Sequence, residues 1–146
     1  MVEERAIATL LREQHVIAGG GGGIAIGRTS TGTAQGSSGL AGVIDKDWMA
    51  ARLAVALEAQ MLVFATNVAG VEDAHGTAQA QLRPRLSVAE ARALLAAGVL
   101  GAGSMAPKVE SALAFVVATG RPALILHSDV LAQALDATPP GTVIVS

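Results

Sequence analysis

The residues best suited to chemistry lie at a predicted helix start, where Lys108 follows the small-residue stretch 101–107. Small residues let the backbone approach a ligand closely, and the first turn of a helix offers N–H groups without intrahelical partners. Lys108 would add a mobile ammonium group about one turn inside that helix. Together these features suit a polyphosphate. A glycine-rich turn followed by a solvated lysine fits the same residues, and the sequence leaves that alternative open.

A second candidate set, Asp45, Lys46 and Asp47, leads into a helix that we expect to end near residue 59. Two lysines and two carboxylates around glycine backbone suit phosphoryl transfer, in which catalysis consists mostly of positioning and charge neutralisation. Mg²⁺ would enter through the phosphates of a nucleotide, with few protein ligands. Alternatively, Asp45 caps the helix and Lys46 and Asp47 form its solvated first turn.

Two further segments are expected at the same edge of a sheet. The glycine run 19–23 follows a predicted strand at residues 15–18, and Thr66 and Asn67 follow a predicted strand at residues 61–65. In open α/β sheets, ligands bind beyond the carboxyl ends of the strands. The glycine run fits neither the dinucleotide fingerprint nor the Walker P-loop, so it does not identify a ligand by itself.

The histidines and the tryptophan carry less information. The three histidines lack the spacing of metal ligands, and we interpret His15 and His127 as strand-end residues and His75 as a loop residue. Trp48 is interpreted as a packing residue. No metal site formed by protein side chains is predicted.

The composition indicates a globular protein of one domain over residues 1–146. Hydrophobic residues make up 51% of the chain and charged residues 15%, which is typical of a parallel sheet covered by helices or of a piece of a larger protein. A net charge of −2 and two Phe beside one Trp argue against a nucleic-acid partner. There is no cysteine for a disulfide or a thiolate site. Without a recognisable secretory signal or membrane span, we expect a soluble, cytoplasmic protein.

The hydrophobic periodicity predicts strands that alternate with helices, which is typical of an α/β fold with a mainly parallel sheet flanked by helices. The low-complexity segment 28–40 is predicted to be a mobile loop, and the connection 66–84 a functional or mobile loop. Ser87 and Glu90 form the pattern of a capping box. The predicted helices are 2–13, 47–59, 87–97, 107–119 and 129–137, and the predicted strands are 15–18, 61–65, 121–126 and 142–145.

These segments together resemble the C-terminal half of carbamate kinase, a member of the amino acid kinase superfamily. The resemblance extends over essentially all 146 residues. Acetylglutamate kinase and uridylate kinase carry looser versions of the same elements. The matching stretches occur in the family's order and are His-Val-Ile-Ala-Gly-Gly-Gly-Gly-Gly-Ile at 15–24, Gly-Val-Ile-Asp-Lys-Asp at 42–47, Ala-Gly-Ser-Met-Ala-Pro-Lys-Val-Glu at 102–110 and Gly-Thr-Val-Ile-Val at 141–145.

The resemblance implies a reversible reaction that makes ATP and carbamate from ADP and carbamoyl phosphate, with Mg²⁺. It implies that Lys46 and Lys108 contact the transferring phosphoryl group and the nucleotide phosphates, and that Asp47 holds the two lysines in position. The other site residues that it implies are Gly20, Gly21 and Gly22 beside the phosphates, Asp45 in the phosphate-binding motif, and Thr66, Asn67, Val68, Ser104 and Met105 in the nucleotide site.

The chain also departs from the carbamate kinase pattern. Members are about twice this length, and the absent half carries another glycine loop, most of the carbamate site and a further lysine. Asn67 stands where an aspartate is usual and Glu72 where a tyrosine is usual, which puts adenine binding in question. Further replacements lie at Ala25, Ala74, His75 and Ala78.

Two classes of function therefore stay open. The first is an enzyme component, active with a separate N-terminal-half polypeptide or within a longer product. The second is a non-catalytic remnant, a nucleotide-binding module or an assembly protein; another amino acid kinase is a further alternative. A half-sheet would expose apolar surface, so we expect a homo-oligomer.

Overall fold

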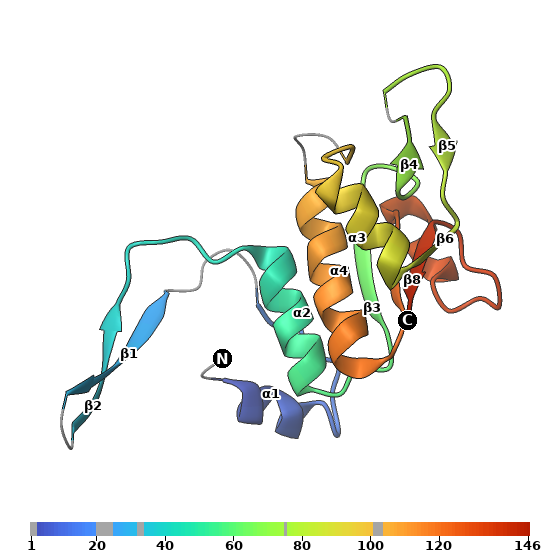
Figure 1. Cartoon of the computed structure of the whole chain (residues 1–146). Helices are drawn as coiled ribbons and strands as arrows, with labels where there is room; N and C mark the ends of the chain where they lie inside the picture. The colour runs from blue at the N-terminus through green and yellow to red at the C-terminus, as the bar shows by residue number, and fades with distance from the viewer. Residues whose placement is uncertain (1–2, 20–24, 32–33, 75, 101–103) are drawn as a thin grey trace.

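The centre of the fold is a four-stranded mixed sheet (Figure 1). The computed structural model describes residues 3–19, 25–31, 34–74, 76–100 and 104–146. The strands lie in the order β3 (Leu62–Thr66), β7 (Ala123–His127), β8 (Thr142–Val145) and β6 (Arg85–Ser87). β3 pairs in parallel with β7, and β6 with β8, whereas β7 and β8 are antiparallel. The predicted α/β class with a mainly parallel sheet is confirmed.

Helices α2 (Lys46–Ala56), α3 (Val88–Ala96) and α4 (Met105–Thr119) cover one face of this sheet. Figure 1 shows α4 between the other two helices. The main core forms where α4 meets the strands, and its members include Val109, Phe115, Val116, Phe64, Ile125 and Ile144. No helix in the described part of the chain is long and apolar enough to cross a membrane.

A short 3₁₀ helix, η1 (Ser128–Gln133), lies against the opposite face. The side chains of β7 alternate between the two faces, as expected for a strand. Ala123 and Ile125 belong to the core on the helix side, whereas Leu124 and Leu126 pack on the side of η1 with Ala134. Both faces of β7 are therefore buried, which explains its continuous apolar sequence.

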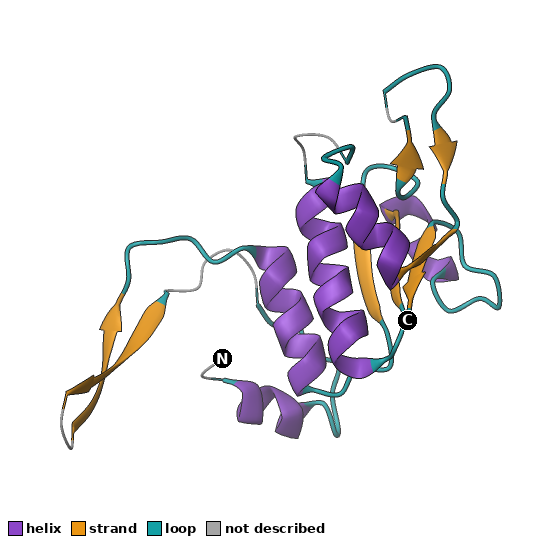
Figure 2. Ribbon diagram, in the orientation of Figure 1, coloured by secondary structure: helices purple, strands orange, loops and turns teal. Residues whose placement is uncertain are grey.

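Two β-hairpins lie outside the sheet. β1 (Ile26–Thr31) pairs with β2 (Ala34–Gly39), and Figure 2 shows this hairpin extending away from the helices. The prediction of a loop at 28–40 is thus wrong over these strands. The strands are held by backbone pairing, and their residues lack the apolar alternation from which a strand can be predicted. A second hairpin, of β4 (Glu72–Asp73) and β5 (Gln81–Leu82), occupies the connection between β3 and β6.

Two further local predictions differ from the structure. The predicted strand 15–18 is wrong: the segment, which follows helix α1 (Glu4–Leu10), forms no strand, and its Ile17 is fully exposed. The predicted helix 129–137 is the shorter η1, capped by the side chain of His127, which accepts a hydrogen bond from the Asp129 N–H.

Short connections fix the direction of the helices relative to the sheet. Gly120, in the left-handed conformation with φ 69°, ends α4 three residues before β7 begins. Arg121 ties the end of α2 to the same place, since its guanidinium group donates to the carbonyl oxygens of Glu58 and Ala59. The ends of α2 and α4 therefore lie where β3 and β7 begin, and the starts of both helices lie where these strands end.

The predicted capping box at the start of α3 is present. The Glu90 N–H donates to the Ser87 hydroxyl oxygen at 3.2 Å, and Glu90 Oε2 accepts from both the Ser87 N–H and the Ser87 hydroxyl at 2.8 Å. The Ser87 backbone N–H, followed by its hydroxyl group, holds the pKa of Glu90 below its ordinary value of 4.5.

Ser87→Ala should lower the free energy of unfolding by about 1 kcal/mol near neutral pH, because the N-terminus of α3 loses its cap. A carboxyl group whose pKa is lowered in the folded state stabilises that state above its unfolded pKa, and the effect disappears as the pH falls through the folded-state pKa. The difference between the two proteins should therefore shrink below pH 4.5. Urea unfolding of both proteins at several pH values measures this difference in the free energy of unfolding. A difference that stays constant with pH would contradict the capping box.

Candidate functional site

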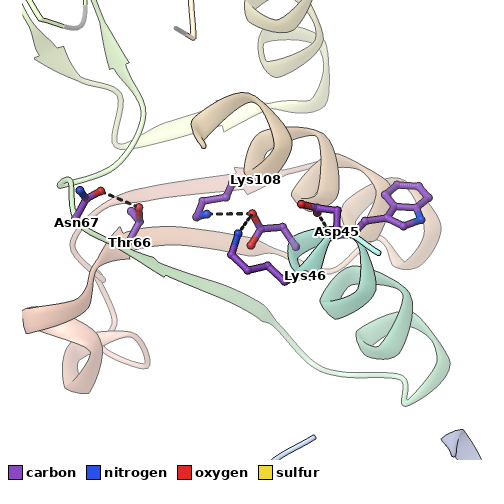
Figure 3. A network of polar contacts seen from close by, with 7 residues as sticks. Asp45, Lys46, Thr66, Asn67 and Lys108 are labelled. Carbon is purple, nitrogen blue, oxygen red and sulfur yellow. Dashed lines mark hydrogen bonds and ion pairs between the residues drawn. The ribbon is translucent and has the colours of Figure 1, made fainter. Parts of the chain in front are cut away.

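The starts of α2 and α4 and the end of β3 meet at one edge of the sheet (Figure 3). In Figure 3, Lys46 and Lys108 come from the two helices and Thr66 from the strand. The figure shows the ammonium group of Lys108 directed toward the end of β3. The sequence prediction that these three segments share the ligand-binding edge of an α/β sheet agrees with this arrangement.

A buried ion pair joins the two helices at this edge. Lys108 Nζ donates to Asp47 Oδ2 at 3.0 Å, and the two residues are 5% and 6% exposed. Burying two charges is unfavourable unless each stabilises the other, so neither residue is compatible with this position alone. The pair therefore links the first turn of α2 to α4.

The spacing of residues along the two helices explains why this pair is buried. Asp47, Ala51 and Ala54 lie four and three residues apart, on the stripe of α2 that is buried. On α4, Lys108 lies four residues before Ala112, which is also fully buried. Alanine side chains allow the helices to approach closely, and the charged residues at the end of the same stripe are drawn into the contact.

Lys46 completes a lysine–aspartate cluster, the name used here for Lys46, Asp47 and Lys108. Its Nζ lies 3.5 Å from Asp47 Oδ2, and its side chain is 62% exposed. Lys46 and Lys108 are the only lysines in the sequence, so both of the chain's lysines contact one carboxylate oxygen. The carboxylate offsets the repulsion between the ammonium groups, and the exposed lysine can move toward an anion without leaving the buried pair unpaired.

Asp45 has the structural role that the sequence left open for it. Its Oδ1 accepts from the Trp48 N–H at 2.8 Å and caps α2. The related interpretation of Asp47 as part of a solvated first turn is wrong, because Asp47 is buried. Trp48 was interpreted as a packing residue, but it is 46% exposed.

The other predicted nucleotide-site residues are distributed around the same edge. Thr66 ends β3, and its hydroxyl group donates to Asn67 Oδ1 at 3.4 Å. Ser104 precedes α4 without forming a side-chain cap, Met105 is its first residue, and Pro107 in its first turn has no N–H to donate. The first turn of α4 thus presents backbone donors that no side chain of this helix satisfies. Val68 follows Asn67 and is half-buried. Gly20, Gly21 and Gly22 lie outside the described residues.

The loop after β3 is fixed to the sheet by polar and steric contacts. Thr142 Oγ1 accepts from the Val71 N–H at 2.8 Å in a buried position. A side chain at Gly70 would place its Cβ 2.6 Å from this oxygen, so the loop requires glycine there. Farther along, Arg83 Nε lies 2.6 Å from Asp73 Oδ2 and stabilises the β4–β5 hairpin. The connection predicted to be mobile or functional is therefore partly ordered by its own pairing.

Nothing in the described part of the chain gathers three or more His, Asp or Glu side chains that could hold a metal ion. The carboxylates nearest the candidate site already have partners, since Asp47 contacts two lysines and Asp45 caps α2. This donor set fits a divalent cation carried by the phosphates of a ligand better than one held by a cage of protein side chains.

Asp47→Ala should lower the free energy of unfolding by about 3–5 kcal/mol, because it leaves the Lys108 charge buried without a partner. Asp45→Ala is the matched control: it removes an aspartate two residues away and should cost about 1 kcal/mol, as expected for loss of a cap. The double variant Asp47→Ala/Lys108→Met should recover much of the lost stability. Urea unfolding followed by circular dichroism measures all three, and equal losses for the two single variants would contradict a strong buried pair.

Comparison with known proteins places this geometry in a family. The sequence profile described as the amino acid kinase family matches residues 2–127. A carbamate kinase from Halobacterium salinarum is 37% identical over 145 residues, which are 99% of this chain and 46% of that protein. A carbamate kinase-like protein from Mycoplasma pneumoniae is 40% identical over 121 residues, 82% of this chain and 38% of that protein.

Solved structures of carbamate kinase also match this chain. Carbamate kinase from Giardia lamblia bound to AMP-PNP matches with a TM-score of 0.89 and 32% identity, over 99% of this chain and 50% of that one. The resemblance to carbamate kinase expected from the motifs is confirmed, and the chain spans about half the length of these relatives. From the fold, the motifs and the profile match together, the chain belongs to the amino acid kinase family.

Proposed function

We propose that this chain supplies the nucleotide-binding part of a carbamate kinase-like phosphotransferase. The reaction moves a phosphoryl group from carbamoyl phosphate to the terminal phosphate of ADP, giving carbamate and ATP, and runs in both directions. The observation that carries the proposal is the lysine–aspartate cluster at the edge of the sheet, where Asp47 holds Lys108 at 3.0 Å and Lys46 at 3.5 Å. The likeness to a carbamate kinase bound to AMP-PNP supports it.

In this proposal each member of the cluster has a separate task. The buried Lys108 provides a fixed positive charge beside the nucleotide phosphates, and the exposed Lys46 follows the phosphoryl group as it transfers. Asp47 positions both lysines and does not contact substrate. Charge neutralisation of this kind suits phosphoryl transfer, in which the protein mainly positions groups and stabilises negative charge.

Around the cluster, the first turn of α4 and the end of β3 would contact the nucleotide. The N–H groups in the first turn of α4 suit phosphate oxygens, and Ser104, Met105, Thr66, Asn67 and Val68 would line the site. Asp45 would contribute to phosphate binding indirectly, because its cap fixes the start of α2, where Lys46 and Asp47 lie. Mg²⁺ would be held chiefly by the phosphate oxygens, where it neutralises charge.

The proposal assigns most of the substrate site to a second polypeptide segment. Because the chain spans about half of its carbamate kinase relatives, we infer that carbamoyl phosphate binds with the help of an N-terminal half, supplied in the same product or separately. The β3 strand favours such a partner. In the described structure it pairs on one side only, and its sequence Leu-Val-Phe-Ala-Thr is apolar.

A second candidate function, nucleotide binding or assembly without catalysis, is favoured by one region. The β4–β5 hairpin contains Glu72 and Asp73, and it lies in the loop where the sequence departs from the carbamate kinase pattern. The ion pair of Asp73 with Arg83 gives this hairpin a structure of its own. If adenine is not recognised there, the site would retain phosphate affinity but lose nucleotide selectivity.

Lys108→Met should weaken the binding of Mg-ADP to the purified chain at least tenfold, because the fixed charge beside the phosphates is removed while the aliphatic stem is retained. Arg5→Met is the matched control, since Arg5 is exposed on α1, which lies by the far end of α2 in Figure 1. Isothermal titration calorimetry gives the affinities, and circular dichroism establishes that each variant is folded, because Lys108→Met removes one member of a buried ion pair. No binding by the folded parent chain, or equal affinity in parent and Lys108→Met, would overturn the proposed nucleotide site.

The isolated chain should self-associate, because β3 has one edge without a partner strand among the described residues, and large apolar side chains such as Ile17, Val43 and Leu135 are strongly exposed. Sedimentation velocity at increasing concentration should show dimers or larger species. Replacing the exposed Ala65 of β3 by lysine should shift the distribution toward monomer, whereas Thr9→Lys on the exposed surface of α1 should not. A single monomeric species at every concentration would contradict this expectation.

A further inference from the structure

His127 lies directly beside Thr66 at the edge of the sheet that carries the candidate site. The two residues are partners in the parallel register of β3 and β7, and each is the last residue of its strand. Side chains opposite each other in paired strands point to the same face. The sequence predicted a strand-end position for His127, which is confirmed, but gave no indication that its neighbour would be a candidate nucleotide-site residue.

The alternation along both strands identifies that face. Leu62 and Phe64 of β3 and Ala123 and Ile125 of β7 belong to the core on the helix side. Two residues farther along each strand, Thr66 and His127 therefore lie on the helix side as well. Since α4 begins at this edge, both residues lie on the side of its first turn, from which Lys108 points toward the end of β3 (Figure 3).

The hydrogen bonding of the imidazole ring defines which nitrogen is available to a ligand. His127 Nδ1 accepts a hydrogen bond from the Asp129 N–H at 3.2 Å and so caps η1. Asp129 Oδ2 also lies 3.6 Å from Nδ1, so Asp129 occupies the surroundings of this nitrogen. A ring that accepts at Nδ1 carries its proton on Nε2, the nitrogen left for a ligand. The side chain is 36% exposed, so this N–H can reach a ligand at the strand edge.

We propose that His127 is a further ligand-binding residue of this site, whose Nε2–H donates to a phosphate oxygen of a bound nucleoside diphosphate. The proposal rests on the proposed function, because it adds a contact to the same nucleotide site. An N–H donor suits this position, because phosphate oxygens accept hydrogen bonds and the two lysines of the site already supply positive charge. The η1 cap fixes the ring, so little rotamer freedom is lost on binding.

Two substitutions separate the two nitrogens. In His127→Asn, the side-chain oxygen lies where Nδ1 was and can still accept from the Asp129 N–H, but the donor at Nε2 is lost. In His127→Gln, the side-chain amide reaches the position of Nε2 and can donate, but the cap is lost. Each variant is titrated with Mg-ADP and with Mg-pyrophosphate by calorimetry, beside the parent chain and Lys108→Met, and thermal unfolding monitors the cap.

We expect His127→Asn to unfold like the parent chain and to bind both ligands about tenfold more weakly, as for loss of a hydrogen bond to a charged group. His127→Gln should bind within about threefold of the parent and unfold at a lower temperature. Unchanged affinity in His127→Asn, when Lys108→Met is weakened, would overturn this inference and leave the proposed function standing. If His127→Asn lost affinity for Mg-ADP but not for Mg-pyrophosphate, the inference would also be overturned, because His127 would then contact the nucleoside rather than a phosphate. Absence of binding by the folded parent would overturn both.

Discussion

The buried ion pair between Asp47 and Lys108 is the interaction on which the candidate site depends. It joins the first turn of α2 to α4 at the edge of the sheet, and its two charges are almost completely removed from water. Such a pair contributes little net stability compared with apolar residues of similar volume, yet loss of either member is costly. Its retention in a helix contact made otherwise of alanine and other apolar residues therefore points to a role in positioning charge rather than to stability.

The surrounding packing provides the rigidity that this positioning needs. Ala51 and Ala54 on α2 bring the helix close to α4, and Arg121 binds the carbonyl groups just beyond the end of α2. Both helices are thus anchored at the strand-starting edge, while their first turns and the ends of β3 and β7 form the opposite edge. A ligand at that edge would meet donors held by secondary structure on three sides, with the exposed Lys46 as the one mobile cation of the cluster.

Sequence patterns predicted those parts of the structure that depend on local chemistry. The Ser87–Glu90 capping box and the strand β8 follow from residue types at fixed spacings, and they occur as expected. The Asp45 cap is one of the two interpretations that the sequence left open. The burial of Asp47 does not follow from such spacings, because it depends on the approach of α4 from sixty-one residues away. The β1–β2 hairpin could not be predicted because its strands show no apolar alternation. The prediction of a strand at 15–18 is wrong because an apolar run forms a strand only where a partner strand is available, and Ile17 is exposed. The strand-end position of His127 was predicted correctly. That it pairs with Thr66 depends on the register between two strands, and the sequence pattern of one strand does not contain this information.

The convergence of both lysines on Asp47 has a consequence for chemical reactivity. Both lysine side chains in the 146-residue sequence belong to the candidate site. One of them, Lys46, is open to solvent, whereas Lys108 is enclosed and engaged with a carboxylate. Agents that acylate or carbamoylate lysine side chains would therefore have few targets on the surface of this chain. Between the two lysines they would act first on Lys46, so that modification of this residue selectively reports the state of the site.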